Sequence, residues 1–304
     1  MKKLFILGLG SLSGFKLANL AKNDFKISGT YNFRNPEIKF ANQHKIDVRD
    51  FSEITDIIQN ESPDYIVNSI GINNVDYCEK NYEESLKINS VFLESISNFT
   101  NDLKIPLIQI STDSIFDGKK STPYIESDIP NPINNYGKSK LRGEKAVSKF
   151  DQNLIIRVSV LYGWLPNHLV IQETSSLKQL NFGHWLILKL KSGESVKIIT
   201  DEISTPILVD DLVSSILHLI KTKQQGIFHS SPPFNINRFE FSTKLAKSLG
   251  LNSDLISPTT NTELGRTVKT ANNKCLNSSK LTNTGFQFLS LDESFNLLKK
   301  QINL

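Results

Sequence analysis

The segment Lys3-Leu4-Phe5-Ile6-Leu7-Gly8-Leu9-Gly10-Ser11-Leu12-Ser13-Gly14 begins as an apolar run and ends as a glycine-rich turn. The run predicts a buried strand over residues 3–8, and the pattern after the turn predicts a helix over residues 12–22. Glycines suit such a turn because they allow tight bending, approach of the backbone to a pyrophosphate, and close packing of helix on strand. The segment therefore predicts a dinucleotide-binding turn, with an ordinary β–α turn as the alternative.

The alternation of apolar runs and amphipathic stretches continues through the first half of the chain. The later runs predicted as strands are residues 26–31, 64–70, 106–111 and 154–160. The stretches predicted as helices are residues 51–59, 82–100 and 136–149. Unbroken apolar strands separated by helices form parallel sheets that are covered on both faces. The sequence therefore predicts an α/β fold with a doubly wound parallel Rossmann-type sheet.

The pattern loosens after Gly163, where residues 164–181 are polar and predict a long excursion. The helices predicted beyond it are residues 185–192, 210–222, 239–249 and 291–302, and the strands are residues 196–199 and 227–230. We expect two domains from this change. The first is an NAD(P)-binding Rossmann domain over residues 1–162, with residues 203–222 packing back on it. The second is a smaller mixed α/β substrate-binding domain over residues 163–304.

Charge and hydropathy exclude two classes of partner. The 35 lysines and arginines exceed the 31 aspartates and glutamates by only four, and the sharpest basic runs are pairs of lysines. Such runs are too short for a nucleic-acid-binding surface. No apolar run reaches the roughly 18 residues of a membrane span, and the run after Lys2-Lys3 is too short for a signal peptide. We expect no nucleic acid, no membrane and a cytoplasmic location.

The residue types that bind metals are scattered. Cys78 and Cys275 are isolated, which excludes a disulfide framework or a cysteine-rich zinc site and suits a reducing compartment. The five histidines show no ligand spacing. The residues therefore predict no metal site.

The end of the second predicted strand favours NADPH as the cofactor. Sites that prefer NAD hold an acid there for the ribose hydroxyls, but this chain has no carboxylate and has Arg34. A guanidinium pairs with a 2′-phosphate, so we predict NADPH, with NADH and a plain surface arginine as the alternatives. The residues predicted to bind the cofactor are Gly8, Gly10, Ser11, Leu12, Gly14, Arg34, Asp47, Val48, Ser69, Ile70 and Gly71.

Tyr136 and Lys140 form a candidate acid–base pair. They are four residues apart on a predicted helix, so their side chains share one helix face. A phenol has a pKa near 10, and a nearby ammonium is expected to lower that pKa. Thr112, at the end of a predicted strand, adds a hydroxyl that can hold a substrate oxygen. The alternative is a helix with one buried tyrosine and one lysine that extends to solvent.

Several stretches together resemble the extended short-chain dehydrogenase/reductase family, and within it the dTDP-4-dehydrorhamnose reductases. The resemblance covers nearly the whole chain. The stretches that carry it are residues 67–79, Asn89, Ser111-Thr112-Asp113-Ser114-Ile115-Phe116-Asp117-Gly118, and residues 136–144, 157–163, 201–206 and 209–212. Ser11 departs from the family's middle glycine, Ser114 from a frequent tyrosine, and Asn277 from an aspartate.

The resemblance implies roles for individual residues. It implies a catalytic set of Thr112, Tyr136 and Lys140, with Lys140 also on the nicotinamide ribose. Asn89 would support the helix and its proton path, and it is counted among the cofactor-binding residues. The residues implied to bind the substrate are Asp76, Asp113, Ser114 and Trp185, to which Arg266 is added, with Lys269, as a candidate for a substrate diphosphate. For Trp185 a core aromatic is the alternative, and for Arg266 a solvated surface charge.

These observations together predict an NADPH-dependent reductase of a 4-keto-6-deoxy nucleotide sugar, of the kind used in dTDP-L-rhamnose biosynthesis. One alternative is another nucleotide-sugar reductase or epimerase of the same fold. Another is a non-catalytic NADP-binding subunit like the regulatory subunit of methionine adenosyltransferase. The expected partner is a small-molecule nucleotide sugar, a homodimer stays open, and magnesium, which some relatives use, stays unassigned.

Overall fold

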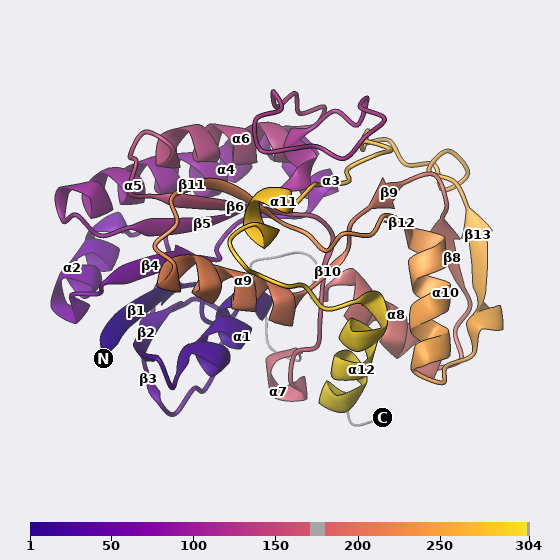
Figure 1. Ribbon diagram of the computed structural model, residues 1–304, viewed down its shortest axis with the longest axis horizontal. Coiled ribbons are helices and arrows are strands. Elements are labelled where there is room, and N and C mark those ends of the chain that lie inside the picture. Colours follow the sequence, from indigo (N-terminus) through magenta and orange to yellow (C-terminus); the bar gives the residue numbers. More distant parts are fainter. Residues whose placement is uncertain (171–179, 303–304) are drawn as a thin grey trace.

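A seven-stranded parallel sheet is the centre of the computed structural model, which describes residues 1–170 and 180–302. Its strands are β1 (Lys2–Leu7), β2 (Phe25–Tyr31), β3 (Ala41–Lys45), β4 (Tyr65–Asn68), β5 (Leu107–Thr112), β6 (Leu154–Val158) and β11 (Gly226–Ser230). They lie in the order β11-β6-β5-β4-β1-β2-β3 (Figure 1), and every neighbouring pair is parallel. The predicted doubly wound sheet is confirmed.

Helices cover both faces of the sheet because side chains alternate along each strand. In β1, Leu4 and Ile6 join one apolar cluster with α1 (Leu12–Ala21) and α9 (Val209–Lys221). Phe5 and Leu7 join a second cluster on the opposite face. The helices of that face are α2 (Phe51–Glu61), α5 (Phe92–Asp102) and α6 (Asn135–Val147). Figure 1 shows the two helical layers on either side of the strands.

Two local features differ from the predictions. Strand β3 was not predicted because it is the edge strand, where none of its residues is fully buried and its sequence is polar. The helix expected over residues 82–100 is divided into α4 (Tyr82–Leu86), a π-helical turn at Lys87–Val91, and α5. Single π-helical turns often occur at functional sites, and this one contains Asn89. A further short helix, α3, spans Val75–Lys80.

The second half of the chain builds a separate apolar cluster, to the right of the sheet in Figure 1. It contains the parallel pair β8 (Val196–Ile199) and β13 (Ile256–Thr259). The helices around this pair are α8 (Phe182–Lys191), α10 (Arg238–Ser248) and α12 (Leu291–Gln301). The shorter elements are β7 (Leu161–Tyr162), α7 (Asn167–Val170), β9 (Ile203–Ser204), β10 (Ile207–Leu208), β12 (Ile236–Asn237), α11 (Ser279–Thr282) and the 3-10 turns Asp113–Ile115 and Ser253–Leu255.

One strand expected in the smaller domain belongs to the main sheet. Strand β11 pairs in parallel with β6, and Phe228 lies in the same apolar cluster as α9. Parallel neighbours need a crossover of a dozen or more residues, and α9 supplies it. A division at residues 162 and 163 stays a prediction. Of the expected excursion over residues 164–181, residues 171–179 lie outside the described part.

The described helices contain none that is long and apolar enough to cross a membrane.

The order of the strands determines where a ligand can bind. Strands β1 and β4 are neighbours, and the chain leaves them toward opposite sides of the sheet. Ligands of doubly wound sheets bind beyond the carboxyl ends of the strands at this switch point, which is where the glycine-rich turn lies.

Candidate active site

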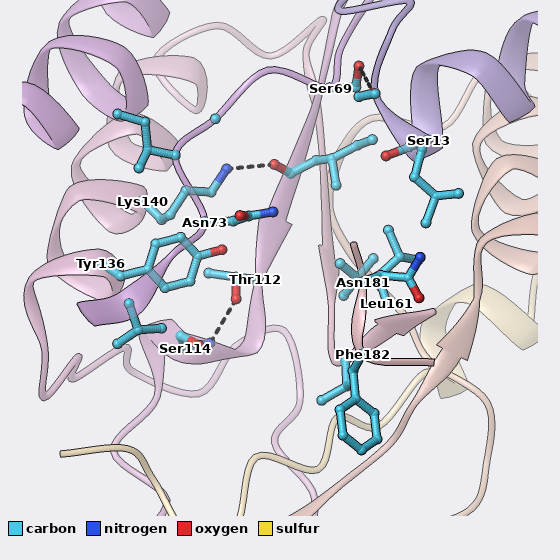
Figure 2. Close-up of a pocket in the computed structure, with 18 of the residues that line it drawn as sticks. Ser13, Ser69, Asn73, Thr112, Ser114, Tyr136, Lys140, Leu161, Asn181 and Phe182 are labelled. Atoms are coloured by element: carbon cyan, nitrogen blue, oxygen red, sulfur yellow. Dashed lines mark hydrogen bonds between the residues drawn. The ribbon is translucent and has the colours of Figure 1, made fainter. Parts of the chain in front are cut away.

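A large cleft opens beyond the carboxyl ends of the strands, with a volume of about 1270 Å³. Pockets for one small ligand usually have about 300–1,000 Å³, so this cleft has room for a cofactor and a second ligand. Thr112, Tyr136 and Lys140 lie on one side of the view in Figure 2, and Leu161, Asn181 and Phe182 lie on the other. The cleft therefore lies between the sheet and the second half of the chain.

The glycine-rich turn brings its backbone to the cleft. Gly8 has a φ of +92°, which favours glycine. A Cβ on Gly10 would lie 2.2 Å from the carbonyl oxygen of Arg34, so only glycine fits there. A Cβ on Gly14 would lie 2.2 Å from the carbonyl oxygen of Gly8. Gly14 is not among the residues that line the cleft; it packs the helix on the strand.

Ser11, the departure from the family's middle glycine, begins helix α1. Its Oγ accepts a hydrogen bond from the amide of Gly14 at 2.9 Å, as an N-cap residue does. The same hydroxyl donates to Ser69 Oγ at 3.0 Å, and Ser69 in turn donates to the carbonyl oxygen of Leu7 at 2.7 Å. Ser11 therefore joins the turn to the end of β4 and still lines the cleft.

Cations lie where the cleft meets the ends of β2 and β3. Arg34 lines it and is only 8% exposed, and burial lowers the pKa of its guanidinium. Asp47 and Val48 also line it. Arg49, which the sequence did not single out, lines the cleft beside them and donates from Nε to Asp47 Oδ1 at 2.9 Å. Hydrogen bonds from Arg49 lower the pKa of Asp47, so this carboxylate is ionised.

The end of β4 is fitted closely to the residues behind it. Ser69, Ile70 and Gly71 line the cleft, and a Cβ on Gly71 would lie 3.7 Å from Lys140 Nζ. Asn89 is buried behind this wall and is not among its lining residues. The Asn89 amide bonds the backbone of Ile72 twice, at 2.9 Å each, and donates to Ser139 Oγ at 3.0 Å. Asn89 thereby fixes the loop after β4 against α6.

Thr112, Tyr136 and Lys140 all line the cleft, and the structure brings them together as predicted. Helix α6 begins at its N-cap Asn134, which accepts from the amide of Gly137 at 2.9 Å. The Tyr136 ring points from the first turn toward Thr112 (Figure 2). Lys140 Nζ, one turn later, donates to the carbonyl oxygen of Ile110 at 2.9 Å. Each of the three residues is less than one-tenth exposed.

Burial controls the charge of this pair. It raises the pKa of Tyr136, and a hydrogen bond with Thr112 lowers it by less. It lowers the pKa of Lys140 to about 8, and the charge of Glu144 opposes the change. The expected lowering of the phenol pKa is therefore wrong for this arrangement, because desolvation of the phenolate is the largest effect on that pKa. A phenol that keeps its proton is suited to act as a general acid.

A buried carboxylate lies beside the phenol. Asp113 is 4% exposed and accepts from Ser159 Oγ at 2.7 Å, from Ser114 Oγ at 3.1 Å and from Thr112 Oγ1 at 3.2 Å. Asp113, Ser114 and Ser159 all line the cleft. The sequence did not single out Ser159, because a serine at a strand end has no distinctive local pattern.

The remaining predicted residues, Asp76, Trp185 and Arg266, also line the cleft. Trp185 stacks on Phe182 with ring centroids 6.0 Å apart. Near Arg266 the wall contains two cations that the sequence missed, Arg238 and Lys274. In residues 1–170 and 180–302 no group of three or more metal-binding side chains converges, and the question of magnesium stays untested.

Known proteins resemble this chain over almost its full length. A probable low-salt glycan biosynthesis reductase from Haloferax volcanii is 28% identical over 279 residues, 91% of this chain and 90% of that protein. Methionine adenosyltransferase 2 subunit beta from Xenopus tropicalis is 28% identical over 87% of this chain and 76% of that protein. The dTDP-4-dehydrorhamnose reductase from Bacillus anthracis, solved with NADP, is 25% identical and covers 99% of both chains with a TM-score of 0.83.

The family-level match agrees with the geometry. The resemblance seen in the sequence to the extended short-chain dehydrogenase/reductases, and to the dTDP-4-dehydrorhamnose reductases within them, is confirmed. The model of the RmlD substrate binding domain matches residues 2–300. That range includes both the glycine-rich turn and the cleft wall supplied by the second half of the chain. The protein therefore belongs to the RmlD substrate binding domain family.

Proposed function

We propose that the protein is an NADPH-dependent reductase of a 4-keto-6-deoxy nucleotide sugar, of the dTDP-4-dehydrorhamnose reductase type in dTDP-L-rhamnose biosynthesis. The observation that carries the proposal is the meeting of Thr112, Tyr136 and Lys140 in a cleft with room for two ligands. The Bacillus anthracis relative, named as this reductase and solved with NADP, supports both substrate class and cofactor. A cytoplasmic location is part of the proposal, and a homodimer stays open.

The residues of the glycine-rich turn fit a dinucleotide. Gly10 lets the turn pass close to the backbone of Arg34, because a Cβ there would meet the Arg34 carbonyl oxygen, and the start of α1 offers amide groups to a diphosphate. Ser69, Ile70 and Gly71 would line the middle of the cofactor, Asp47 and Val48 its adenine end, and Arg34 its 2′-phosphate. When bound, NADPH supplies a hydride for reduction of a ketone.

The chain's own residues would supply the proton. Tyr136 keeps its hydrogen because burial raises its pKa, so its hydroxyl donates the proton to the ketone oxygen as that oxygen becomes an alcohol. Thr112 Oγ1 orients the same oxygen, and Lys140 holds the ribose of the cofactor with its ammonium. Asp113, with Ser114 and Asp76, would bind sugar hydroxyls. General acid catalysis of this kind typically contributes about 10²–10⁴ in rate.

The proposed role of Lys140 predicts that the affinity for NADPH depends on pH. Its pKa is lowered to about 8 by burial, so the ammonium is present below that pH and is lost above it. We expect the affinity for NADPH to fall as the pH rises through 8, and fluorescence titration of NADPH at pH values on both sides of 8 measures this. Lys140→Met removes the titrating group, so its weaker affinity should not change over the same range. A wild-type affinity that stays constant contradicts the role of Lys140.

Arg34 determines the cofactor preference in this proposal. Hydrogen bonds to charged groups contribute about 1.5–3 kcal/mol, which corresponds to roughly 10- to 100-fold in affinity. We therefore expect Arg34→Gln to raise the KM for NADPH by roughly that factor and to leave the KM for NADH nearly unchanged. Steady-state kinetics with both cofactors measure the ratio. Equal changes for the two cofactors would mean that Arg34 supports the fold instead of the 2′-phosphate.

The direct test is turnover. Purified protein mixed with NADPH and dTDP-4-dehydrorhamnose should oxidise NADPH and form dTDP-L-rhamnose, detected by absorbance and by chromatography. No oxidation of NADPH counts against this substrate. Retention of tightly bound NAD⁺ with isomerisation of a nucleotide sugar, and no net redox change, would instead identify an epimerase of the same fold.

A second candidate is a non-catalytic regulatory subunit. The similarity to methionine adenosyltransferase 2 subunit beta favours it. The buried phenol and ammonium on the cleft wall favour catalysis, because a silent site has no need of them. A protein that binds NADPH, fails to reduce nucleotide-sugar ketones and changes the kinetics of a methionine adenosyltransferase would support the second candidate.

A further inference from the structure

Two buried amides, Asn68 and Gln109, lie behind the cleft wall near the carboxyl ends of β4 and β5. They are 0% and 1% exposed, and neither is among the residues that line the cleft. They are register partners in the sheet, and Asn68 Nδ2 donates to Gln109 Oε1 at 2.7 Å. Burying two amides is costly unless their hydrogen bonds are satisfied, so their remaining contacts show what the pair holds in place.

The other end of the Gln109 amide meets the acceptor of the Lys140 ammonium. Because Gln109 Oε1 accepts from Asn68, Gln109 Nε2 points away from it and donates to the carbonyl oxygen of Ile110. Lys140 Nζ donates to the same oxygen at 2.9 Å, along the dashed line that begins at Lys140 in Figure 2. A carbonyl oxygen has two lone pairs and can accept both donors. This oxygen therefore joins Gln109 to Lys140.

The Ile110 carbonyl lies where the sheet supports β5 on one side only. The pairing of β4 with β5 ends at Asn68 and Gln109, so Ile110 is the first residue of β5 beyond it. On the other side Ile110 still pairs with Ile156 of β6. The Gln109 side chain therefore supplies a hydrogen bond to the backbone at the point where the neighbouring strand has ended.

Asn68 holds a second part of the cleft wall. Its Oδ1 accepts from the amide of Ile70 at 3.1 Å, and its Nδ2 lies 3.4 Å from the carbonyl oxygen of Ile70. Ile70 lines the cleft beside the proposed position of the middle of the cofactor. The same pair of amides thus holds Ile70 at one end and the acceptor of Lys140 at the other.

We propose that Gln109 is a positioning residue for Lys140, and that Asn68 keeps the Gln109 amide in the orientation that this role needs. The proposal rests on the proposed function, in which the Lys140 ammonium holds the cofactor ribose. An ammonium has three donors, and the fixed carbonyl oxygen of Ile110 takes one of them, which sets the direction of the other two. Without Gln109 this oxygen can turn away, and the buried ammonium loses an acceptor that favours its charged form.

The charge of Lys140 receives little support from its other neighbours among the described residues. Glu144 acts on it from the next turn of α6, but Glu144 is already part of a buried ion pair with β6. Cys78 acts on it from α3, but burial raises the pKa of that thiol to about 11, so it is neutral. Tyr136 keeps its proton because burial raises its pKa, and Asn89 is an uncharged amide. The acceptor on β5 therefore matters for keeping the ammonium charged.

The titration of Lys140 is the first test, and it is measured without cofactor. In protein labelled with ¹³Cε-lysine, the NMR resonance of Lys140 is assigned by its loss in Lys140→Met. We expect Gln109→Met, which keeps the volume and removes both hydrogen bonds, to lower the midpoint by about one pH unit. Gln109→His should keep the midpoint near that of the wild type, because a neutral imidazole again offers one acceptor and one donor. A midpoint that stays in place or rises in Gln109→Met overturns the proposal.

Asn153 provides a matched control at the opposite end of the same strand. It is 3% exposed, does not line the cleft, and accepts from the amide of Leu107, the first residue of β5, at 2.9 Å. Its own amide nitrogen donates two further hydrogen bonds. Asn153→Leu should lower the unfolding temperature, as Gln109→Met does, and leave the Lys140 midpoint in place. An equal shift in Asn153→Leu would mean that Lys140 responds to the loss of any buried amide, and it overturns the positioning role.

The second test is the affinity for NADPH at two pH values. The ammonium is lost above its pKa of about 8. A midpoint lowered to about 7 leaves about a third as much ammonium at pH 7.5 and most of it at pH 6. We therefore expect Gln109→Met to bind NADPH up to about threefold more weakly than the wild type at pH 7.5, and almost equally at pH 6. Fluorescence titration measures both. A loss of the same size at both pH values would mean that the substitution distorts the cleft, and it overturns the proposal.

A double-mutant cycle tests the role of Asn68. If Asn68 acts through the Gln109 amide, Asn68→Leu lowers the Lys140 midpoint in the wild type and hardly changes it in Gln109→Met. Shifts that simply add overturn the role of Asn68. Asn68→Leu also tests Gln109 without replacing it, because the Gln109 amide is then free to turn. An unchanged midpoint in Asn68→Leu therefore counts against the proposal even where Gln109→Met does not fold.

The two proposals fail separately. A protein whose Lys140 midpoint falls in Gln109→Met, but which reduces no nucleotide-sugar ketone, contradicts the proposed function and leaves the positioning role standing. A protein that reduces dTDP-4-dehydrorhamnose, with the same Lys140 midpoint and the same KM for NADPH in the wild type and Gln109→Met, keeps the proposed function and overturns the positioning role.

Discussion

Replacement of Tyr136 by phenylalanine should lower kcat for ketone reduction by about 10²–10⁴ while leaving the affinity for NADPH nearly unchanged. The hydroxyl is the group proposed to donate the proton, and burial keeps it protonated by raising its pKa. Phenylalanine keeps the ring, so the packing at the start of α6 is preserved. Stopped-flow or steady-state oxidation of NADPH measures kcat, and fluorescence titration measures cofactor binding.

Tyr124→Phe is the matched control for this substitution. Tyr124 is also buried, stacks on Phe116 at 4.1 Å and donates its hydroxyl hydrogen to Asp117 at 2.9 Å, but it is not among the residues that line the cleft. Its removal should lower stability slightly and leave kcat unchanged. Turnover of Tyr136→Phe equal to that of the wild type would refute proton donation by the phenol, whatever the substrate.

The strands were predictable where burial leaves a local pattern. Apolar runs identified β1, β2, β4, β5 and β6, because both faces of these strands are covered. Strand β3 lies at the edge and is polar, so its sequence has no such run. Strand β11 is apolar and was predicted, but its partner was not. Its pairing with β6 depends on how α9 packs on the sheet, which no local pattern describes.

The site was predictable where the fold determines the location of a residue. Thr112 ends a strand and Tyr136 begins the next helix, so both must lie at the carboxyl edge of the sheet. Arg238 and Lys274 on the cleft wall were missed because only tertiary packing brings them together with Arg266 around Glu202. The charge state of Tyr136 was mispredicted for a related reason. Sequence shows the nearby lysine but not the burial, and burial has the largest effect on the Tyr136 pKa.

A buried ion pair between Glu144 and Arg157 anchors helix α6 to the sheet. Glu144 and Arg157, 3% and 2% exposed, form three contacts of 2.9, 3.1 and 3.2 Å between α6 and β6. Breaking one partner of a buried pair typically costs about 3–5 kcal/mol, because it leaves the other charge uncompensated. We expect Glu144→Gln to lower the free energy of unfolding by about that amount, measured by urea denaturation. Glu94→Gln, at the exposed contact with Lys149, should change it little.

Glu144→Gln should also change the chemistry of the cleft, which a purely structural anchor would not do. Glu144 follows Lys140 by one turn of α6, and its charge opposes the lowering of the Lys140 pKa by burial. Without that charge the Lys140 pKa falls further below its present value of about 8, so the pH above which NADPH affinity declines should move down. Glu94→Gln leaves that limit in place. A destabilised Glu144→Gln protein with an unchanged pH limit would mean that Glu144 holds α6 but does not tune the ammonium beside Tyr136.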